Sequence, residues 1–151
     1  MPTVSRTRSV RAAPNEIWAI LSQPRRLPEW WPGVQRVEDA SREAWTTVLS
    51  SPRGKSVRAD YTLVEVEERT RLVWRHEVEE SPFERILRQS VTELELEAQG
   101  AGLTKVTITA RQRPRGFARF GFVQLRRAAV RQLDGALDGL ERLLPVGGSG
   151  G

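Results

Sequence analysis

Five consecutive segments between Glu43 and Arg111 alternate apolar and polar side chains, and residues that favour turns separate them. Successive side chains of a strand point to opposite faces, so this alternation predicts strands with one apolar and one polar face. The expected strands are Ala44–Ser50, Lys55–Glu67, Arg71–Glu77, Glu84–Ala98 and Leu103–Arg111. Because the links between them are short, neighbouring strands should be antiparallel, as in a meander. A sheet with a single apolar face needs another element to cover that face.

An amphipathic helix is expected to provide that cover. From about Ala118 to Leu144, apolar residues recur at spacings of three or four, which is typical of a helix with one buried face. At 1.5 Å per residue such a helix is about 40 Å long, enough to cross the sheet. Gly135 and Gly139 lie on or near its apolar face, although glycine weakens a helix interior by up to about 1 kcal/mol. These glycines indicate either close packing or empty space.

Shorter elements are predicted before the sheet. Thr3–Val10 has the β-branched and polar composition of a strand, and a short helix should open at Pro14, which suits the first helical position. One or two further helical turns then precede a strand at Val34–Glu38. Trp30 and Trp31 lie next to each other in these turns and cannot both face one core direction. One of them is therefore expected to face a cavity, a lid or solvent.

The composition limits the chemistry that is open to the chain. A length of 151 residues fits one domain, expected at 1–145 and followed by a flexible Gly/Ser tail at 146–151. Cysteine is absent and His76 is the single histidine, which argues against disulfides, thiol nucleophiles and metal sites, so that no metal or cofactor is expected. No apolar run approaches the roughly 20 residues that span a bilayer, and the N-terminus lacks the apolar stretch of a signal peptide. A cytoplasmic location is predicted.

Arginine dominates the positive charge. The net charge is +5, and only Lys55 and Lys105 of the 24 basic residues are lysines. Acidic residues are interspersed, which favours a coding bias toward arginine over a basic binding block, and nucleic acid is not expected as a partner. The densest basic region comprises Arg111, Arg113, Arg115, Arg119, Arg126, Arg127 and Arg131. It is either a solvated face or, with the phenylalanines of the same stretch, a rim for peripheral contact with an anionic membrane.

The order of the elements is similar to that of the START/Bet v 1-like (SRPBCC) superfamily, in particular its bacterial polyketide cyclase/dehydrase and lipid-transport families. Two segments carry this resemblance, which extends over about residues 3–144: RAAPNEIW at Arg11–Trp18 and LPEWWPGV at Leu27–Val34. It implies an α+β helix-grip fold, in which a curved antiparallel sheet wraps around a long C-terminal helix and two short helices follow the first strand. It also implies an apolar ligand cavity between sheet and helix. The two motifs are helix starts and packing turns, so they identify the fold rather than the ligand.

Strand alternation and helical spacing nominate the residues that would line this cavity. On the sheet the candidates are Tyr61, Trp74, His76, Arg88, Leu94, Leu96 and Ile108. On the helix and just before it they are Phe117, Phe120, Leu125 and Ala129, with Trp30 or Trp31 at the mouth.

Three candidates can do chemistry, and each has a plainer alternative. Arg88 shares the parity of Leu94 and Leu96, so an unbroken strand would aim it into the cavity as an anchor for an acidic or carbonyl-bearing ligand, whereas a bulge would turn it outward. His76 is a general base or a solvated residue at a strand end. Tyr61 either polarises a carbonyl of the ligand or only makes a hydrogen bond with a neighbouring residue. The tryptophans offer flat surfaces to a lipid, isoprenoid or polycyclic ligand, or fill the core.

Two functions remain open from the sequence. The first is binding, sequestration or transport of a hydrophobic small molecule, which the one-sided sheet and the absence of a nucleophile or metal set favour. The second is an aromatase/cyclase-type enzyme that folds a poly-β-carbonyl chain in the same cavity. Such chemistry needs a shaped pocket and one or two groups for enolisation, for which Tyr61, His76 and Arg88 are the candidates.

Overall fold

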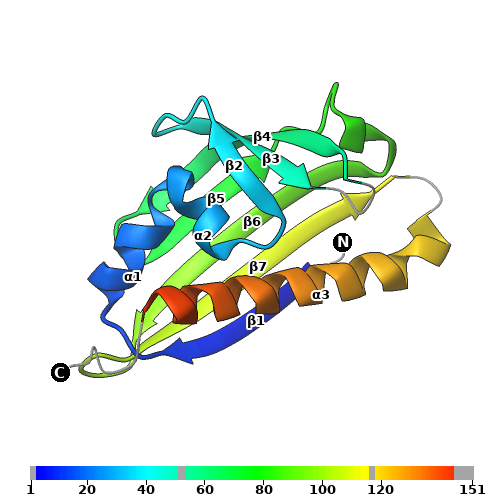
Figure 1. Cartoon of the computed structure of the whole chain (residues 1–151). Helices are drawn as coiled ribbons and strands as arrows, with labels where there is room; N and C mark the ends of the chain where they lie inside the picture. Colours follow the sequence, from blue (N-terminus) through cyan, green and yellow to red (C-terminus); the bar gives the residue numbers. More distant parts are fainter. Residues whose placement is uncertain (1–2, 51–53, 116–117, 145–151) are drawn as a thin grey trace.

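A computed structural model describes residues 3–50, 54–115 and 118–144, the side chains of 118–122 excepted. One antiparallel sheet of seven strands curves around a single long C-terminal helix, and two shorter helices follow the first strand (Figure 1). The strand order is β1-β7-β6-β5-β4-β3-β2, so the first two strands of the sequence form the two edges. The predicted helix-grip fold of the α+β class is confirmed. The predicted Gly/Ser tail at 146–151 lies outside the described residues.

The elements follow the sequence pattern closely. The strands are β1 (Thr3–Val10), β2 (Val34–Glu38), β3 (Ala44–Ser50), β4 (Ser56–Glu67), β5 (Arg71–His76), β6 (Leu87–Ala98) and β7 (Thr104–Pro114). The helices are α1 (Pro14–Leu21), α2 (Leu27–Trp30) and α3 (Ala118–Leu143), with single 3-10 turns η1 (Pro24–Arg26) and η2 (Pro82–Arg85). The prediction was wrong at Glu84, which lies in η2 rather than in a strand. Ser81 caps this turn by accepting a hydrogen bond from the Phe83 amide at 3.1 Å, so β6 begins only at Leu87.

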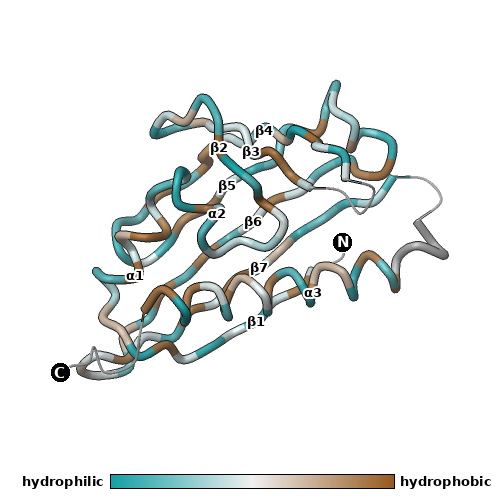
Figure 2. Tube along the Cα trace, viewed as in Figure 1, coloured by the Kyte–Doolittle hydropathy of each residue, from teal (hydrophilic) through white to brown (hydrophobic). Residues whose placement is uncertain are grey.

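The core lies between the concave face of the sheet and α3. Leu133, Leu137 and Leu140 of α3 are fully buried together with Val106 and Ile108 of β7. Figure 2 shows apolar and polar residues alternating along the strands and recurring along α3, as a one-sided sheet and its covering helix require. Each such side chain contributes roughly 1.5–3 kcal/mol by its burial. No helix in the described part of the chain is long and apolar enough to cross a bilayer.

Two glycines let the chain around α2 approach α3 closely. A Cβ atom on Gly139 would lie 2.8 Å from the Trp30 Cα and 2.9 Å from the Trp30 carbonyl carbon, which is closer than Cβ atoms pack in proteins. On Gly135 it would lie 2.7 Å from Cγ of Pro32. Of the two explanations that the sequence left open for these glycines, close packing therefore holds.

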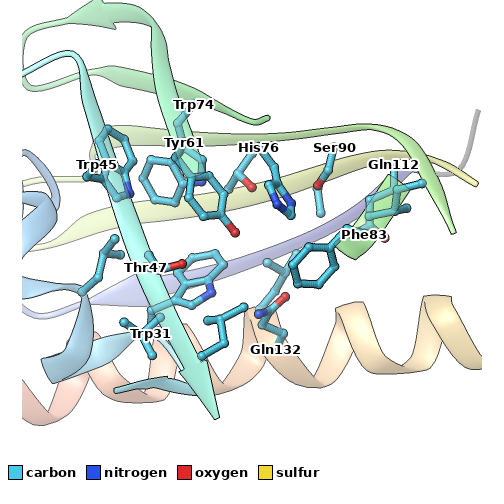
Figure 3. A pocket seen from close by; sticks show the side chains of 17 residues that line it. Trp31, Trp45, Thr47, Tyr61, Trp74, His76, Phe83, Ser90, Gln112 and Gln132 are labelled. Carbon is cyan, nitrogen blue, oxygen red and sulfur yellow. The ribbon is translucent and has the colours of Figure 1, made fainter. Parts of the chain in front are cut away.

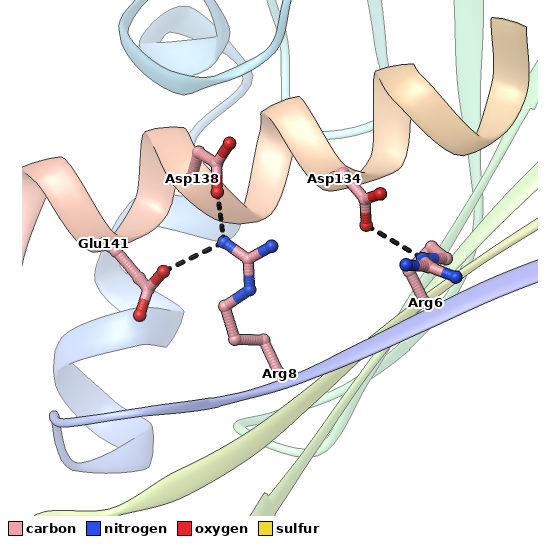
Figure 4. Close-up of polar contacts among 5 residues, drawn as sticks. All are labelled: Arg6, Arg8, Asp134, Asp138 and Glu141. Atoms are coloured by element: carbon pink, nitrogen blue, oxygen red, sulfur yellow. Dashed lines mark hydrogen bonds and ion pairs between the residues drawn. The ribbon is translucent and has the colours of Figure 1, made fainter.

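Arginines of the edge strand β1 fix the position of α3 (Figure 4). Arg6 donates from Nε to Oδ1 of Asp134 at 2.8 Å. Arg8 donates from Nη1 to Asp138 and, at 2.9 Å, to Oε1 of Glu141. Exposed ion pairs contribute at most about 1 kcal/mol each, so these contacts set the placement of the helix more than they add stability.

Candidate functional site

A pocket lies between the concave face of the sheet and α3, at the end of the sheet where η2 joins β5 to β6 (Figure 3). Its volume is about 150 Å³. Aromatic, aliphatic and neutral polar side chains line it, and none of these described residues is Asp, Glu, Lys or Arg. They are Leu27, Trp31, Val34, Trp45, Thr47, Leu49, Tyr61, Trp74, His76, Phe83, Leu87, Ser90, Thr92, Ala110, Gln112, Gln132 and Leu133.

The pairing register of the sheet builds the floor of the pocket. Trp45 pairs with Tyr61, and Tyr61 pairs in turn with His76. His76 pairs with Ser90, and Ser90 with Gln112. Residues directly opposite each other on neighbouring strands have their Cβ atoms about 4.5–5.5 Å apart, so these five side chains form one row from β3 to β7. The adjacent row contributes Trp74, Thr92 and Ala110.

Aromatic rings form a continuous wall on one side of the pocket. Tyr61 stacks on Trp45 with 6.0 Å between ring centroids and on His76 with 4.9 Å. Trp74 meets both Trp45 and Trp31 edge to face, at 5.7 Å in each case. Such pairs contribute about 0.5–1.5 kcal/mol each beyond their burial, so the wall is held in a defined shape.

Tyr61 is a hydrogen-bond donor rather than a base at neutral pH. Burial raises the pKa of its phenol to about 12, and a hydrogen bond with the Thr47 hydroxyl opposes this rise. Figure 3 shows the phenol oxygen pointing into the pocket. The proton therefore stays on the phenol. Because the Thr47 hydroxyl donates to the Ala59 carbonyl at 3.3 Å, the phenol donates to Thr47 and can turn from it to the carbonyl oxygen of a bound molecule.

His76 is a buried, neutral imidazole. Burial lowers its pKa below the ordinary value of 6.5, although Asp60 and Glu77 oppose the shift. Its Nε2 atom is buried and has no hydrogen-bond partner, and the same holds for Nε1 of Trp45. Figure 3 shows the ring nitrogens of His76 directed into the pocket beside Phe83. The predicted solvated position of His76 at a strand end was wrong, since only 6% of the residue is exposed.

The titration of His76 should reveal this burial. Because the native state favours the neutral ring, the unfolded chain binds the proton more readily, and stability falls as the pH is lowered from 6.5 toward the native pKa. Above pH 6.5 the contribution of His76 to stability is constant. As this is the only histidine of the chain, one imidazole signal in an NMR titration reports it without ambiguity. A midpoint at or above 6.5 would contradict this account, and His76→Phe should flatten the pH dependence of stability in this range.

A family model described as polyketide cyclase / dehydrase and lipid transport matches residues 1–145 of the chain. The chain belongs to this family. Solved structures that share the fold include the di-domain ARO/CYC protein BexL from the BE-7585A biosynthetic pathway, with a TM-score of 0.80 and 16% identity over 99% of this chain and 48% of that one. A START superfamily protein from Mycobacterium smegmatis has a TM-score of 0.74 and 15% identity, with 92% and 94% of the two chains covered.

A protein from Thermus thermophilus has a TM-score of 0.75 and 18% identity, with 93% of this chain and 95% of that chain covered. A comparison with curated proteins gave no match. Identities this low show the fold alone. The ligand of this member of the polyketide cyclase/dehydrase and lipid transport family must therefore be inferred from its own pocket.

Of the residues that the sequence of this family member predicts to line the pocket, some do so and others lie in the core. Trp31, Tyr61, Trp74 and His76 line the pocket. The core instead contains Trp30, Leu94, Leu96, Ile108 and Ala129. Leu125 is half-buried and does not line the pocket, Phe117 lies outside the described residues, and the side chain of Phe120 is likewise not described. Alternation identified the concave face correctly, but Leu94, Leu96 and Ile108 lie farther along it, where the sheet is covered by core side chains.

Arg88 does not face the pocket. The pairing of β6 with β7 shifts between Leu87 and Gln89, which inserts one extra residue at Arg88. Leu87, paired with Pro114, takes the inward position and lines the pocket, while Arg88 is exposed. The prediction of an inward anchor was wrong, and the alternative, a bulge that turns Arg88 outward, is confirmed.

Several lining residues were not nominated from the sequence. In β3, Trp45, Thr47 and Leu49 alternate on the inward face and could have been found by the same rule as the other strands. Ser90 and Gln112 continue the inward parity of Leu94 and Ala110, but as polar residues they do not look like part of an apolar face. Phe83 lies in η2, where no strand rule applies, and Gln132 lies at the border of the apolar face of α3.

Proposed function

We propose that this protein binds a hydrophobic small molecule in the pocket, so as to sequester or carry it. The observation that carries the proposal is an unfilled, aromatic-lined space between sheet and helix, where an ordinary core would have packed side chains. Concave, mostly apolar sites with a few placed polar groups are the usual form of a small-molecule site. Membership of the family agrees with this function.

The pocket volume limits what the closed structure can enclose. Ligand sites for larger molecules measure about 300–1,000 Å³, whereas an apolar cavity of about 150 Å³ accommodates a benzene molecule. With a volume of about 150 Å³, this pocket holds one ring of a ligand. A longer lipid or polycyclic ligand would have to extend through the mouth or move α3 away from the sheet.

Native mass spectrometry of protein purified from its own host tests the proposal. The expected result is a mass increment that disappears on organic extraction, with the released compound identified in the extract. A protein that carries no compound and also binds none of a panel of neutral aromatic, isoprenoid and lipid probes would contradict it.

A second candidate function is catalysis by an aromatase/cyclase-type mechanism on a polyketide. The names of two structures that share the fold describe them as di-domain ARO/CYC proteins of biosynthetic pathways. The observation that favours it here is the stacked pair of Tyr61 and His76, a protonated phenol beside a neutral imidazole, which can polarise a carbonyl and accept a proton from the adjacent carbon. Unchanged turnover of a poly-β-carbonyl substrate after Tyr61→Phe and His76→Phe would exclude this role.

Peripheral contact with an anionic membrane remains part of the proposal, as does a cytoplasmic location. Of the basic region defined above, Arg113, Arg115, Arg126, Arg127 and Arg131 are exposed. Each arginine near an anionic surface contributes about 1 kcal/mol, so Arg113→Glu with Arg115→Glu should weaken binding to phosphatidylserine vesicles by at least about tenfold. Arg11→Glu is the matched control, because Arg11 is exposed and follows the C-terminal end of β1, whereas Arg113 and Arg115 lie near its N-terminal end. Sedimentation at two salt concentrations measures the effect, and equal binding to neutral phosphatidylcholine vesicles would contradict membrane recognition by charge.

A further inference from the structure

We propose that the pocket selects an uncharged, flat ring ligand that bears a carbonyl oxygen, and that the indole N–H of Trp45 donates to this oxygen beside Tyr61 and His76. The inference rests on the proposed function and narrows it from hydrophobic molecules in general to one chemical class. Three features of the pocket carry it: two buried nitrogens without partners, the absence of charged lining residues, and a flat aromatic wall.

The unpartnered nitrogens call for a polar group on the ligand. Nε1 of Trp45 and Nε2 of His76 make no hydrogen bond, although only 4% and 6% of these residues are exposed. A buried polar group without a partner destabilises the protein, and a bound molecule that supplies the partner removes this penalty. An indole nitrogen can only donate, so the ligand must present an acceptor to Trp45, whereas a neutral imidazole nitrogen can donate or accept.

Tyr61 lies between these two residues and adds a third polar group. Its ring stacks on Trp45 with 11° between the planes and on His76 with 25°, so the three rings form one stack. The phenol keeps its proton at neutral pH. The Thr47 hydroxyl donates to the Ala59 carbonyl at 3.3 Å, so the phenol donates its proton to Thr47. A carbonyl oxygen has two lone pairs, so a ligand that accepts from Trp45 keeps a second one with which it can compete with Thr47 for the phenol proton.

The charge of the lining excludes ionised ligands from the interior. None of the described residues that line the pocket is Arg or Lys, and Arg88, which an unbroken strand β6 would aim into the pocket, is exposed. A carboxylate or phosphate placed in such a site would be desolvated without a counter-ion, which is strongly unfavourable. Fatty-acid carboxylates and phospholipid headgroups therefore do not fit inside, even though the outer surface is rich in arginine.

The shape of the wall favours a flat ring. Trp31, Trp74 and Trp45 present ring edges and faces to a space of about 150 Å³. Aromatic faces bind planar groups by stacking and by edge-to-face contact. A ring ketone satisfies this shape, the neutral charge and the donors together.

Three bicyclic probes of similar size separate these requirements, each with one ring in the pocket and the second extending through the mouth. They are 1-tetralone, which has a ring carbonyl, tetralin, which has none, and 1-naphthoate, which is ionised. Calorimetry or tryptophan fluorescence with the full chain gives their affinities. Trp45→Phe removes the N–H and keeps an aromatic ring, so it should lower the ratio of tetralone to tetralin affinity about fivefold, the value of one hydrogen bond.

Trp30→Phe is the matched control. Nε1 of Trp30 is also buried without a partner, but Trp30 does not line the pocket, so this replacement should leave the ratio unchanged. The NMR signal of the Trp45 indole N–H, assigned by its loss in Trp45→Phe, should shift on addition of tetralone much more than on addition of tetralin. Thermal unfolding of both variants shows whether either replacement damages the fold.

The outcomes distinguish this inference from the proposed function. An affinity ratio that Trp45→Phe does not change, or naphthoate binding tighter than tetralone, would overturn the inference while a hydrophobic-ligand function stands. Failure of all three probes to bind, together with the absence of a co-purified compound, would overturn both.

Discussion

Replacement of Gly139 by alanine should lower the free energy of unfolding by about 2 kcal/mol, even though alanine is the better helix former by up to about 1 kcal/mol. The added Cβ would lie 2.8 Å from Cα of Trp30 and 2.9 Å from its carbonyl carbon. These are main-chain atoms, which cannot rotate away, so either α2 or α3 must shift. Denaturant unfolding followed by circular dichroism measures the loss.

Gly135→Ala is the matched control, because both replacements gain the same helix propensity and lie one turn apart on α3. Its Cβ would meet Cγ of Pro32 at 2.7 Å, the flexible edge of a side-chain ring that can change its pucker. The loss should therefore be less than about 1 kcal/mol. Equal effects at the two positions, or a more stable Gly139→Ala protein, would show that α2 does not rest on α3 as described.

Replacement of Ala110 by phenylalanine should abolish ligand binding without unfolding the protein. Ala110 lies in the floor of the pocket, paired with Thr92 of β6. A cavity of about 150 Å³ is filled by a benzene molecule, so the new phenyl ring would occupy most of this pocket. The affinity for the compound that co-purifies with the protein, or for 1-tetralone, should fall at least about a hundredfold, which corresponds to roughly 2.7 kcal/mol.

The stability of the same variant makes the result decisive. Filling a cavity with an apolar ring commonly raises stability by about 0.5–2 kcal/mol, so the melting temperature should stay constant or rise while binding is lost. Ala128→Phe, at an exposed position of α3, is the control for the added ring and should leave binding unchanged. If Ala110→Phe kept its full affinity, the ligand site would have to lie elsewhere.

The fold could be predicted from the sequence because its determinants are local and repeated. Alternation along β3 to β7 marks one apolar face, short turns impose antiparallel pairing, and the spacing of Leu133, Leu137 and Leu140 marks the buried side of the covering helix. Each signal spans many residues, so a single exception such as the helical turn at η2 changes one boundary and not the architecture. The meaning of Gly135 and Gly139 could not be settled in this way, because it depends on where α2 lies.

The pocket could be predicted only in part. Alternation shows which residues of a strand face inward, but it does not show where along that face the pocket lies. Tyr61 and His76 belong to the row that lines the pocket, while Leu94 and Ile108 belong to a row that fills the core, and all four have the same inward parity. The two rows differ in the elements that cover them, namely different parts of α3 and different helical turns. That placement depends on long-range contacts, such as those of Arg6 and Arg8 with α3, that no local pattern reveals.

The bulge in β6 has a consequence for how ligand preference can change among proteins of this fold. The position opposite Pro114 belongs to the pocket, and the single extra residue in β6 decides that Leu87 rather than Arg88 occupies it. Without the bulge, Arg88 would lie opposite Pro114, and its guanidinium group would point into the pocket. Loss of the bulge could thus convert a site for neutral molecules into one for acids, while Ser90 and Thr92 of the same strand kept their places in the pocket.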